Sequence, residues 1–216
     1  TGMTDRRLPI YFLADTSGSM RGEPIESVNI GLRSMVAALR QNPYALETVH
    51  LSIVTFDSEI KEVLPLTAIE TVALPEIVCP QSGATLIGAG LEFIVEKVHR
   101  EVRRTSSDNK GDWRPLLFVL TDGKPTDVLA YKEVVPKIKA CGFGNIIACA
   151  AGPKADAESL KSFADRVVSL DTMDANAFAS FFQWVSTAVT AGSSSVGASS
   201  TGVELPPPPP EVQFVV

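Results

Sequence analysis

The sequence predicts a doubly wound α/β domain in which a mainly parallel sheet carries helices on both faces. Short, continuous apolar runs alternate along the chain with segments in which apolar residues recur at helical spacing. Strands buried on both faces give continuous apolar runs of this kind. A helix between successive strands implies right-handed crossovers, which join parallel neighbours. We therefore expect a six-stranded sheet with one antiparallel strand at an edge.

The expected strands are short and mostly apolar. Residues 8–14 form the first run, and residues 51–56 form the second. Residues 60–64 follow the second run after only three residues, which favours a hairpin and hence the antiparallel edge strand. The remaining strands are expected at residues 115–121, 145–151 and 167–170.

Helices are expected between these strands. Pro24 suits the first turn of a helix, and Pro43 is expected to end that helix. Four further segments have helical spacing of apolar residues or lie between strands, at residues 86–104, 128–140, 155–163 and 175–190.

The chain divides into a domain and a tail. Residues 1–191 have the composition of one globular domain. Residues 192–202 are rich in Ser, Gly and Thr, which predicts a flexible linker. The five prolines at 206–210 predict a stiff polyproline II segment, and the apolar residues 212–216 could add as a strand to a sheet edge.

Composition excludes several classes of function. The net charge of −6 and pI of about 5.0 argue against binding to nucleic acid. No apolar run approaches the ~18 residues of a membrane helix, and the first residues lack the apolar stretch of a secretory signal. The three cysteines are an odd number without a CxxC pair, which favours a reducing compartment. We therefore expect a cytoplasmic protein without nucleic-acid or membrane partners.

Three polar stretches are expected at one edge of the sheet. In such folds ligands bind at the carboxyl ends of the strands, where the strand order reverses. The stretch DTSGS follows the first strand, SGAT precedes the helix at 86–104, and TDG ends the fourth strand. Together they offer two carboxylates and three hydroxyls: Asp15, Ser17, Ser19, Thr85 and Asp122.

This set of oxygens suits a hard divalent cation. Mg²⁺ takes six oxygen ligands and keeps several waters, so two aspartates can balance its charge while hydroxyls add neutral ligands. An open position on such an ion would bind an acidic group of a partner. Mn²⁺ and Ca²⁺ accept the same oxygens. Gly18, Gly83, Gly123 and Asp127 are expected beside the ligands, the glycines allowing close backbone approach and Asp127 capping the next helix.

The pattern Asp-x-Ser-x-Ser, a distant Thr and a distant Asp before Gly resembles the metal-ion-dependent adhesion site (MIDAS) of the von Willebrand factor A domain family. The resemblance covers roughly residues 8–191. It implies one bound divalent cation, most simply Mg²⁺, with Asp15, Ser17, Ser19, Thr85 and Asp122 as its ligands directly or through water. It further implies a non-enzymatic protein-binding module, in which a Glu or Asp of the partner completes the metal shell.

The stretch LTDGKPTD at residues 120–127 more narrowly resembles the bacterial TerY-like branch of that family, which is linked to tellurium resistance. That resemblance implies a role in a stress response and suggests a protein kinase and a PP2C-type phosphatase as partners.

Three other interpretations stay open at this level. Asp15, Ser17 and Ser19 alone would also fit a capped turn. A Mg²⁺-dependent phosphohydrolase would use Asp15 as nucleophile, but Ser17 stands where such enzymes need a second Asp, and only Lys124 lies near to balance a phosphoryl group. A nucleotide site is disfavoured because DTSGSMRGEP has neither GxGxxG nor GxxxxGK[ST].

Overall fold

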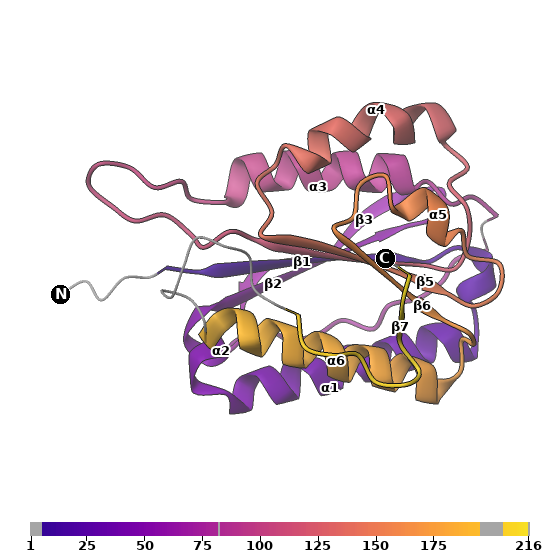
Figure 1. The fold of residues 1–216 in the computed structure, drawn as a ribbon, viewed down its shortest axis with the longest axis horizontal. Helices are drawn as coiled ribbons and strands as arrows, with labels where there is room; N and C mark the ends of the chain where they lie inside the picture. Colours follow the sequence, from indigo (N-terminus) through magenta and orange to yellow (C-terminus); the bar gives the residue numbers. More distant parts are fainter. Residues whose placement is uncertain (1–5, 82, 195–204, 216) are drawn as a thin grey trace.

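The computed structural model describes residues 6–81, 83–194 and 205–215, and it shows one sheet between two layers of helices (Figure 1). The strand order is β3-β2-β1-β4-β5-β6-β7. The five central strands run parallel, and β3 and β7 pair antiparallel at the two edges. The strands are β1 Leu8–Asp15, β2 Val49–Phe56, β3 Ile60–Ala68, β4 Leu116–Thr121, β5 Asn145–Ala151, β6 Arg166–Leu170 and β7 Gln213–Phe214.

The predicted fold class is confirmed, and the sheet has one strand more than the six expected. The additional strand is β7, which lies in the C-terminal tail and pairs with β6 at the edge opposite the β2–β3 hairpin. It has only two residues, but it lies within residues 212–216, which were expected to add as a strand to a sheet edge, and that expectation is confirmed.

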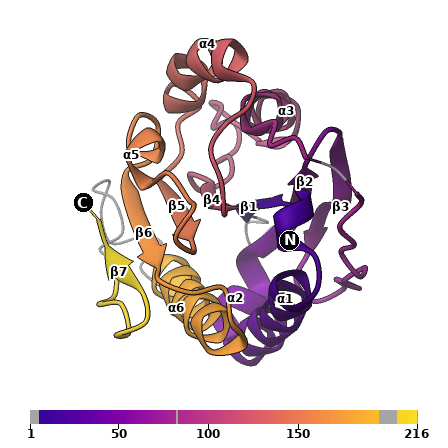
Figure 2. The same cartoon turned by 90° about the vertical axis from the view of Figure 1, so that its right-hand side faces the viewer.

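The helices cover both faces of the sheet (Figure 2). Helices α1, α2 and α6 lie on one face, and α3, α4 and α5 lie on the other. Their bounds are α1 Glu23–Gln41, α2 Pro43–Thr48, α3 Ile87–Glu101, α4 Val128–Lys139, α5 Ala157–Leu160 and α6 Ala175–Ser194. The short helix α2 was not expected, because Pro43 both follows α1 and begins α2, where Asn42 accepts a hydrogen bond from Ala45 N.

Strand β1 shows why its sequence is apolar up to its last residue, Asp15. All eight of its residues are buried. Ile10 and Phe12 pack with the α1–α6 layer, while Tyr11 and Leu13 pack with the α3–α4 layer. A central parallel strand therefore needs apolar side chains at every position, and not at alternate ones.

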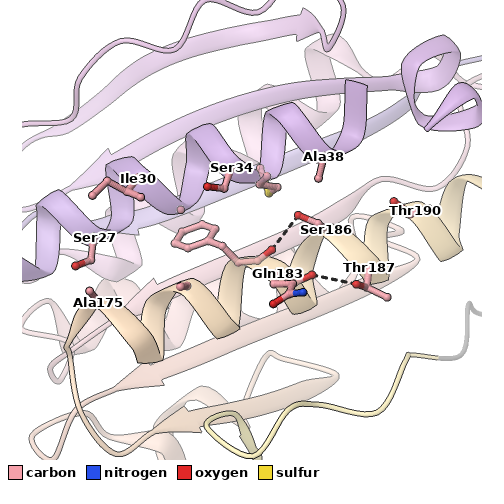
Figure 3. Close-up of a pocket in the computed structure, with 13 residues that line it drawn as sticks. Ser27, Ile30, Ser34, Ala38, Ala175, Gln183, Ser186, Thr187 and Thr190 are labelled. Carbon is pink, nitrogen blue, oxygen red and sulfur yellow. Dashed lines mark hydrogen bonds between the residues drawn. The ribbon is translucent and has the colours of Figure 1, made fainter. Parts of the chain in front are cut away.

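Helices α1 and α6 contact each other closely beneath the sheet. The ring of Phe182 stacks on Phe12 with 5.5 Å between centroids, and Gly31 of α1 leaves the space that this ring occupies. A groove of about 590 Å³ runs between the two helices, and Figure 3 shows the hydroxyls of Ser186 and Thr187 hydrogen-bonded to the backbone of α6 itself. None of the five predicted metal ligands lines this groove.

The end of the chain packs back on the domain. Helix α6 continues three residues into the segment predicted as a linker, and the rest of that segment, residues 195–202, lies outside the described residues. Trp184 Nε1 donates to Pro206 O at 3.0 Å, Val212 is buried in the core, and the Phe214 ring lies edge-on to Trp184. The tail thus covers both α6 and the open edge of β6.

Across the part of the chain that the structure describes, no helix combines the length and the apolar character that crossing a bilayer requires.

Candidate metal centre

Asp15 ends β1 as a fully buried carboxylate. Its Oδ1 accepts a hydrogen bond from the backbone N of Ser17 at 2.7 Å. Its Oδ2 accepts one from Thr121 Oγ1 at 2.9 Å. Since β1 and β4 are neighbouring parallel strands, Asp15 joins the two loops at their carboxyl ends.

The two serines after Asp15 lie together. Residues Gly18–Met20 form a single 3₁₀ turn that brings Ser17 Oγ and Ser19 Oγ within 3.2 Å of each other. Ser17 is buried and Ser19 is exposed, so one hydroxyl of the pair lies in the interior and the other at the surface. Two hydroxyls and a carboxylate therefore share one loop, as the sequence pattern predicts.

Asp122 carries the most telling feature of the site. It is only 4% exposed, and its Oδ1 is buried without a hydrogen-bond partner among the described residues. A buried polar atom left in this way costs folding free energy, and a buried carboxylate oxygen more than most. Its position next to Asp15 is marked by a long contact from Asp122 N to Asp15 Oδ2 at 3.5 Å.

Burial and the charge of Asp122 both act on Asp15. Loss of solvent is the largest cause that raises the pKa of the Asp15 carboxyl, and the neighbouring Asp122 carboxylate adds to it. The hydrogen bonds from Ser17 and Thr121 oppose the rise, and the net pKa is about 6. Two carboxylates are thus held together in the interior without a cation among the described protein groups to balance them.

Thr85 comes to the same edge from the loop before α3. Its backbone N donates to Thr126 Oγ1 at 3.0 Å, and Thr126 N donates to Thr85 O at 3.0 Å, which ties this loop to the one that follows β4. A Cβ placed on Gly123 would lie 3.8 Å from Thr85 Oγ1. The Thr85 hydroxyl therefore lies against the turn that begins at Asp122.

The structure refines the expectations for the glycines and for Asp127. A Cβ on Gly83 would meet nothing within 4 Å, so the protein alone does not require glycine there. Asp127 precedes α4, but its side chain does not cap that helix. Its two oxygens instead accept from Gly88 N and Ala89 N at the start of α3, at 3.1 and 2.8 Å. A carboxylate is favoured at this helix N-terminus by the free N–H groups and the helix dipole.

Sequence reasoning missed a third buried carboxylate at this edge. Asp57 follows β2, is 1% exposed, and accepts a hydrogen bond from Thr16 Oγ1 at 2.8 Å. Its backbone O accepts from Leu86 N at 3.2 Å. Asp57 therefore holds Thr16, which lies between Asp15 and Ser17. It also holds Leu86, which follows Thr85. An aspartate directly after a buried strand, as at Asp15, was the signal that could have revealed it.

The donor set decides which metal chemistry fits. Among the described residues no group of three or more His, Cys, Asp or Glu side chains could hold a metal ion. The loops at the carboxyl ends of β1 and β4 and before α3 supply carboxylates and hydroxyls, which suit hard, oxygen-binding cations.

Comparisons with known proteins agree with this fold. The family model described as the von Willebrand factor type A domain matches residues 10–182. Matrilin-3 of Gallus gallus is 26% identical over 182 residues, which are 82% of this chain and 37% of matrilin-3. Matrilin-1 of Bos taurus is 25% identical over 141 residues, which are 63% of this chain and 25% of matrilin-1.

Solved structures of low identity share the fold. Proximal thread matrix protein 1 from the mussel byssus, in a structure described as having a zinc-occupied MIDAS motif, has a TM-score of 0.64 and 20% identity. That similarity covers 84% of this chain and 47% of the thread protein. The pilus adhesin SpaC from Lactobacillus rhamnosus GG has a TM-score of 0.66 and 14% identity, over 87% of this chain and 30% of SpaC. This chain therefore spans less than half the length of each of these four relatives.

Proposed function

Because this chain belongs to the von Willebrand factor type A domain family, we propose that it is a non-enzymatic module that binds a protein partner through a divalent metal ion. The proposed ligands, directly or through water, are Asp15, Ser17, Ser19, Thr85 and Asp122. The observation that carries the proposal is the buried, unpartnered Oδ1 of Asp122 beside the buried Asp15, since a cation would balance both carboxylates.

The chemistry of the site supports a hard cation. Two carboxylates would neutralise the charge of a divalent ion, and three hydroxyls add neutral oxygens, which leaves the bound ion electrophilic. Mg²⁺ is our first choice, with Mn²⁺ and Ca²⁺ as the other candidates. The thread protein described with zinc in its MIDAS motif adds Zn²⁺ to the ions worth testing.

The partner would supply a carboxylate. Ser19 is exposed, while Asp15 and Asp122 are buried. The protein ligands would therefore contact the ion from the interior side, and its solvent-facing side would be open to water or to a partner. A Glu or Asp side chain is the protein group that best matches an electrophilic divalent ion at an open position.

The competing phosphohydrolase has less support. A nucleophile must reach its substrate, but Asp15 is fully buried and both of its carboxylate oxygens accept hydrogen bonds. The measurement that separates the two functions is release of p-nitrophenol from its phosphate ester in the presence of Mg²⁺. Turnover that Asp15→Asn abolishes would overturn the non-enzymatic proposal.

The experiment that tests the metal site is a calorimetric titration. Mg²⁺ and Mn²⁺ are titrated into chelator-treated wild type, into Asp122→Asn and into the control Asp171→Asn, whose exposed carboxylate follows β6. We expect a single site that Asp122→Asn abolishes and Asp171→Asn retains. Equal binding by wild type and Asp122→Asn would contradict the proposal.

The narrower assignment to the TerY-like branch stays a prediction from residues 120–127. With it go the stress-response role, the cytoplasmic location, and a protein kinase and a PP2C-type phosphatase as partners. The four relatives named above carry no such description. The test is tellurite tolerance of the native host after the chromosomal gene is changed to Asp122→Asn. Unchanged tolerance, with normal amounts of the protein, would contradict this assignment.

A further inference from the structure

A groove between α4 and α5 begins at the loop that carries Asp122. Its volume is about 520 Å³, within the range of ~300–1,000 Å³ common for binding pockets. Lys124 and Pro125 line one part of it, two and three residues after Asp122. On the α5 side, the backbone N of Asp156 donates a hydrogen bond to Gly123 O at 3.5 Å. The groove is thus continuous with one of the three loops of the proposed metal site.

The groove has an apolar wall that the fold does not cover. Val128 and Val135 of α4 line it, and Val128 is 54% exposed. The adjacent Leu129 is 71% exposed but does not line the groove. Tyr131 forms the base, held by hydrogen bonds of its hydroxyl to Ser159 O and Ser162 Oγ. Its ring is therefore fixed, and the wall is preformed.

Charge complementarity indicates the sign of the occupant. Lys124 and Lys132 both line the groove, and neither has a hydrogen-bond or ion-pair partner among the described residues. The one carboxylate in the lining, Asp156, already accepts from Ser159 N at 3.2 Å. In a chain of net charge −6, two unpaired lysines beside a proposed cation site make a locally positive surface.

We propose that this groove, which we call the α4–α5 groove, is the second half of the partner-binding surface. The occupant is an acidic protein segment: one carboxylate binds the metal, a nearby apolar side chain enters the groove against Val128 and Tyr131, and further carboxylates pair with Lys124 and Lys132. The inference rests on the proposed function and specifies the partner's chemistry, since the metal alone would accept any accessible carboxylate.

The experiment starts from a random peptide library displayed on phage. It is panned on the full chain in Mg²⁺ and eluted with chelator, and the enriched peptides are synthesised and titrated calorimetrically. We expect these peptides to combine Asp or Glu with apolar residues. Val128→Asp should weaken their binding by about tenfold or more, because it places a charge on the apolar wall and repels acidic groups. The matched control Leu129→Asp adds the same charge one residue outside the groove and should change binding little.

A second variant tests the lysines, and metal affinity separates this inference from the proposed function. Lys124→Glu combined with Lys132→Glu should weaken peptide binding and reverse its salt dependence. Mg²⁺ binding should be retained or become tighter, because the change removes positive charge beside the proposed cation site. Some peptides could require Asp122 for binding and still bind Val128→Asp and the lysine variant as tightly as wild type. That result would contradict a role of the groove in partner binding, while the proposed metal site would still be supported. Peptides that bind without metal, or no enrichment at all, would overturn the inference. Self-association of the chain that Val128→Asp abolishes would assign the groove to a second copy, and would also overturn it.

Discussion

Asp15→Asn should stabilise the metal-free chain at neutral pH. The change removes a buried negative charge while keeping the shape of the side chain. The Asn oxygen can still accept from Ser17 N, and its amide group can donate to Thr121 Oγ1 in place of the present hydrogen bond. A proposed metal ligand is thus expected to destabilise the folded chain when no metal is bound.

The pKa of Asp15 sets the size of this effect. The pKa is about 6 in the folded chain, against an ordinary value of 3.8. The folded chain therefore keeps a proton that the unfolded chain releases between these two pH values, so the free energy of unfolding falls as pH rises through this range. At ~1.4 kcal/mol per pKa unit, the wild type loses about 3 kcal/mol by neutral pH. Allowing about 1 kcal/mol for imperfect hydrogen bonds of Asn, we expect a net gain of about 2 kcal/mol.

Urea unfolding in the presence of chelator measures the difference between the two chains across this pH range. The advantage of Asp15→Asn should be large at neutral pH, should shrink as pH falls from about 6 to 3.8, and should disappear below 3.8, where Asp15 is neutral in both the folded and the unfolded chain. The exposed control Asp171→Asn should follow wild type at every pH. A difference that does not vary with pH, or an Asp15→Asn chain less stable than wild type at neutral pH, would refute the reasoning.

Two further predictions concern packing. Gly31→Ala should destabilise the chain by about 1–3 kcal/mol in urea unfolding, because its Cβ would lie 2.1 Å from the Phe182 ring. Gly83→Ala has open space and should stay within about 0.5 kcal/mol of wild type, and equal effects of the two changes would contradict this packing. Removal of residues 205–216 should expose Trp184 and the β6 edge. We expect red-shifted tryptophan emission and self-association on size-exclusion chromatography, and unchanged emission and elution would show that the tail does not cover this edge in solution.

The central part of the fold was predictable because its strands are buried on both faces. Residues 8–14 and 145–151 read as continuous apolar runs, and the structure has strands at Leu8–Asp15 and Asn145–Ala151. The periphery was less predictable. Helix α2 has six residues and carries no periodic pattern, and β7 comprises only two of the five residues expected to add to a sheet edge. Their positions depend on contacts distant in sequence, such as Phe214 against Trp184.

The candidate site likewise has a part that the sequence could predict and a part that it could not. Asp15 and Asp122 could be placed at one edge because each follows a strand, and neighbouring parallel strands end together. The partners of Asp127 could not be derived, because Gly88 and Ala89 lie about 40 residues earlier and only the packing of α3 against α4 brings them near. Asp57 directly follows a strand, but it was overlooked because no Ser-x-Ser pattern comes after it, as one does after Asp15, to distinguish it from an ordinary turn residue.

The most direct test of the metal centre is anomalous scattering from crystals of the chain soaked in Mn²⁺. We predict a single strong peak in contact with oxygens of the Asp15–Ser19 loop and within reach of Thr85 and Asp122, and loss of that peak in Asp122→Asn crystals. A peak elsewhere, or none at this edge of the sheet in a well-ordered crystal, would contradict the proposal that these two buried carboxylates are held together to bind a cation.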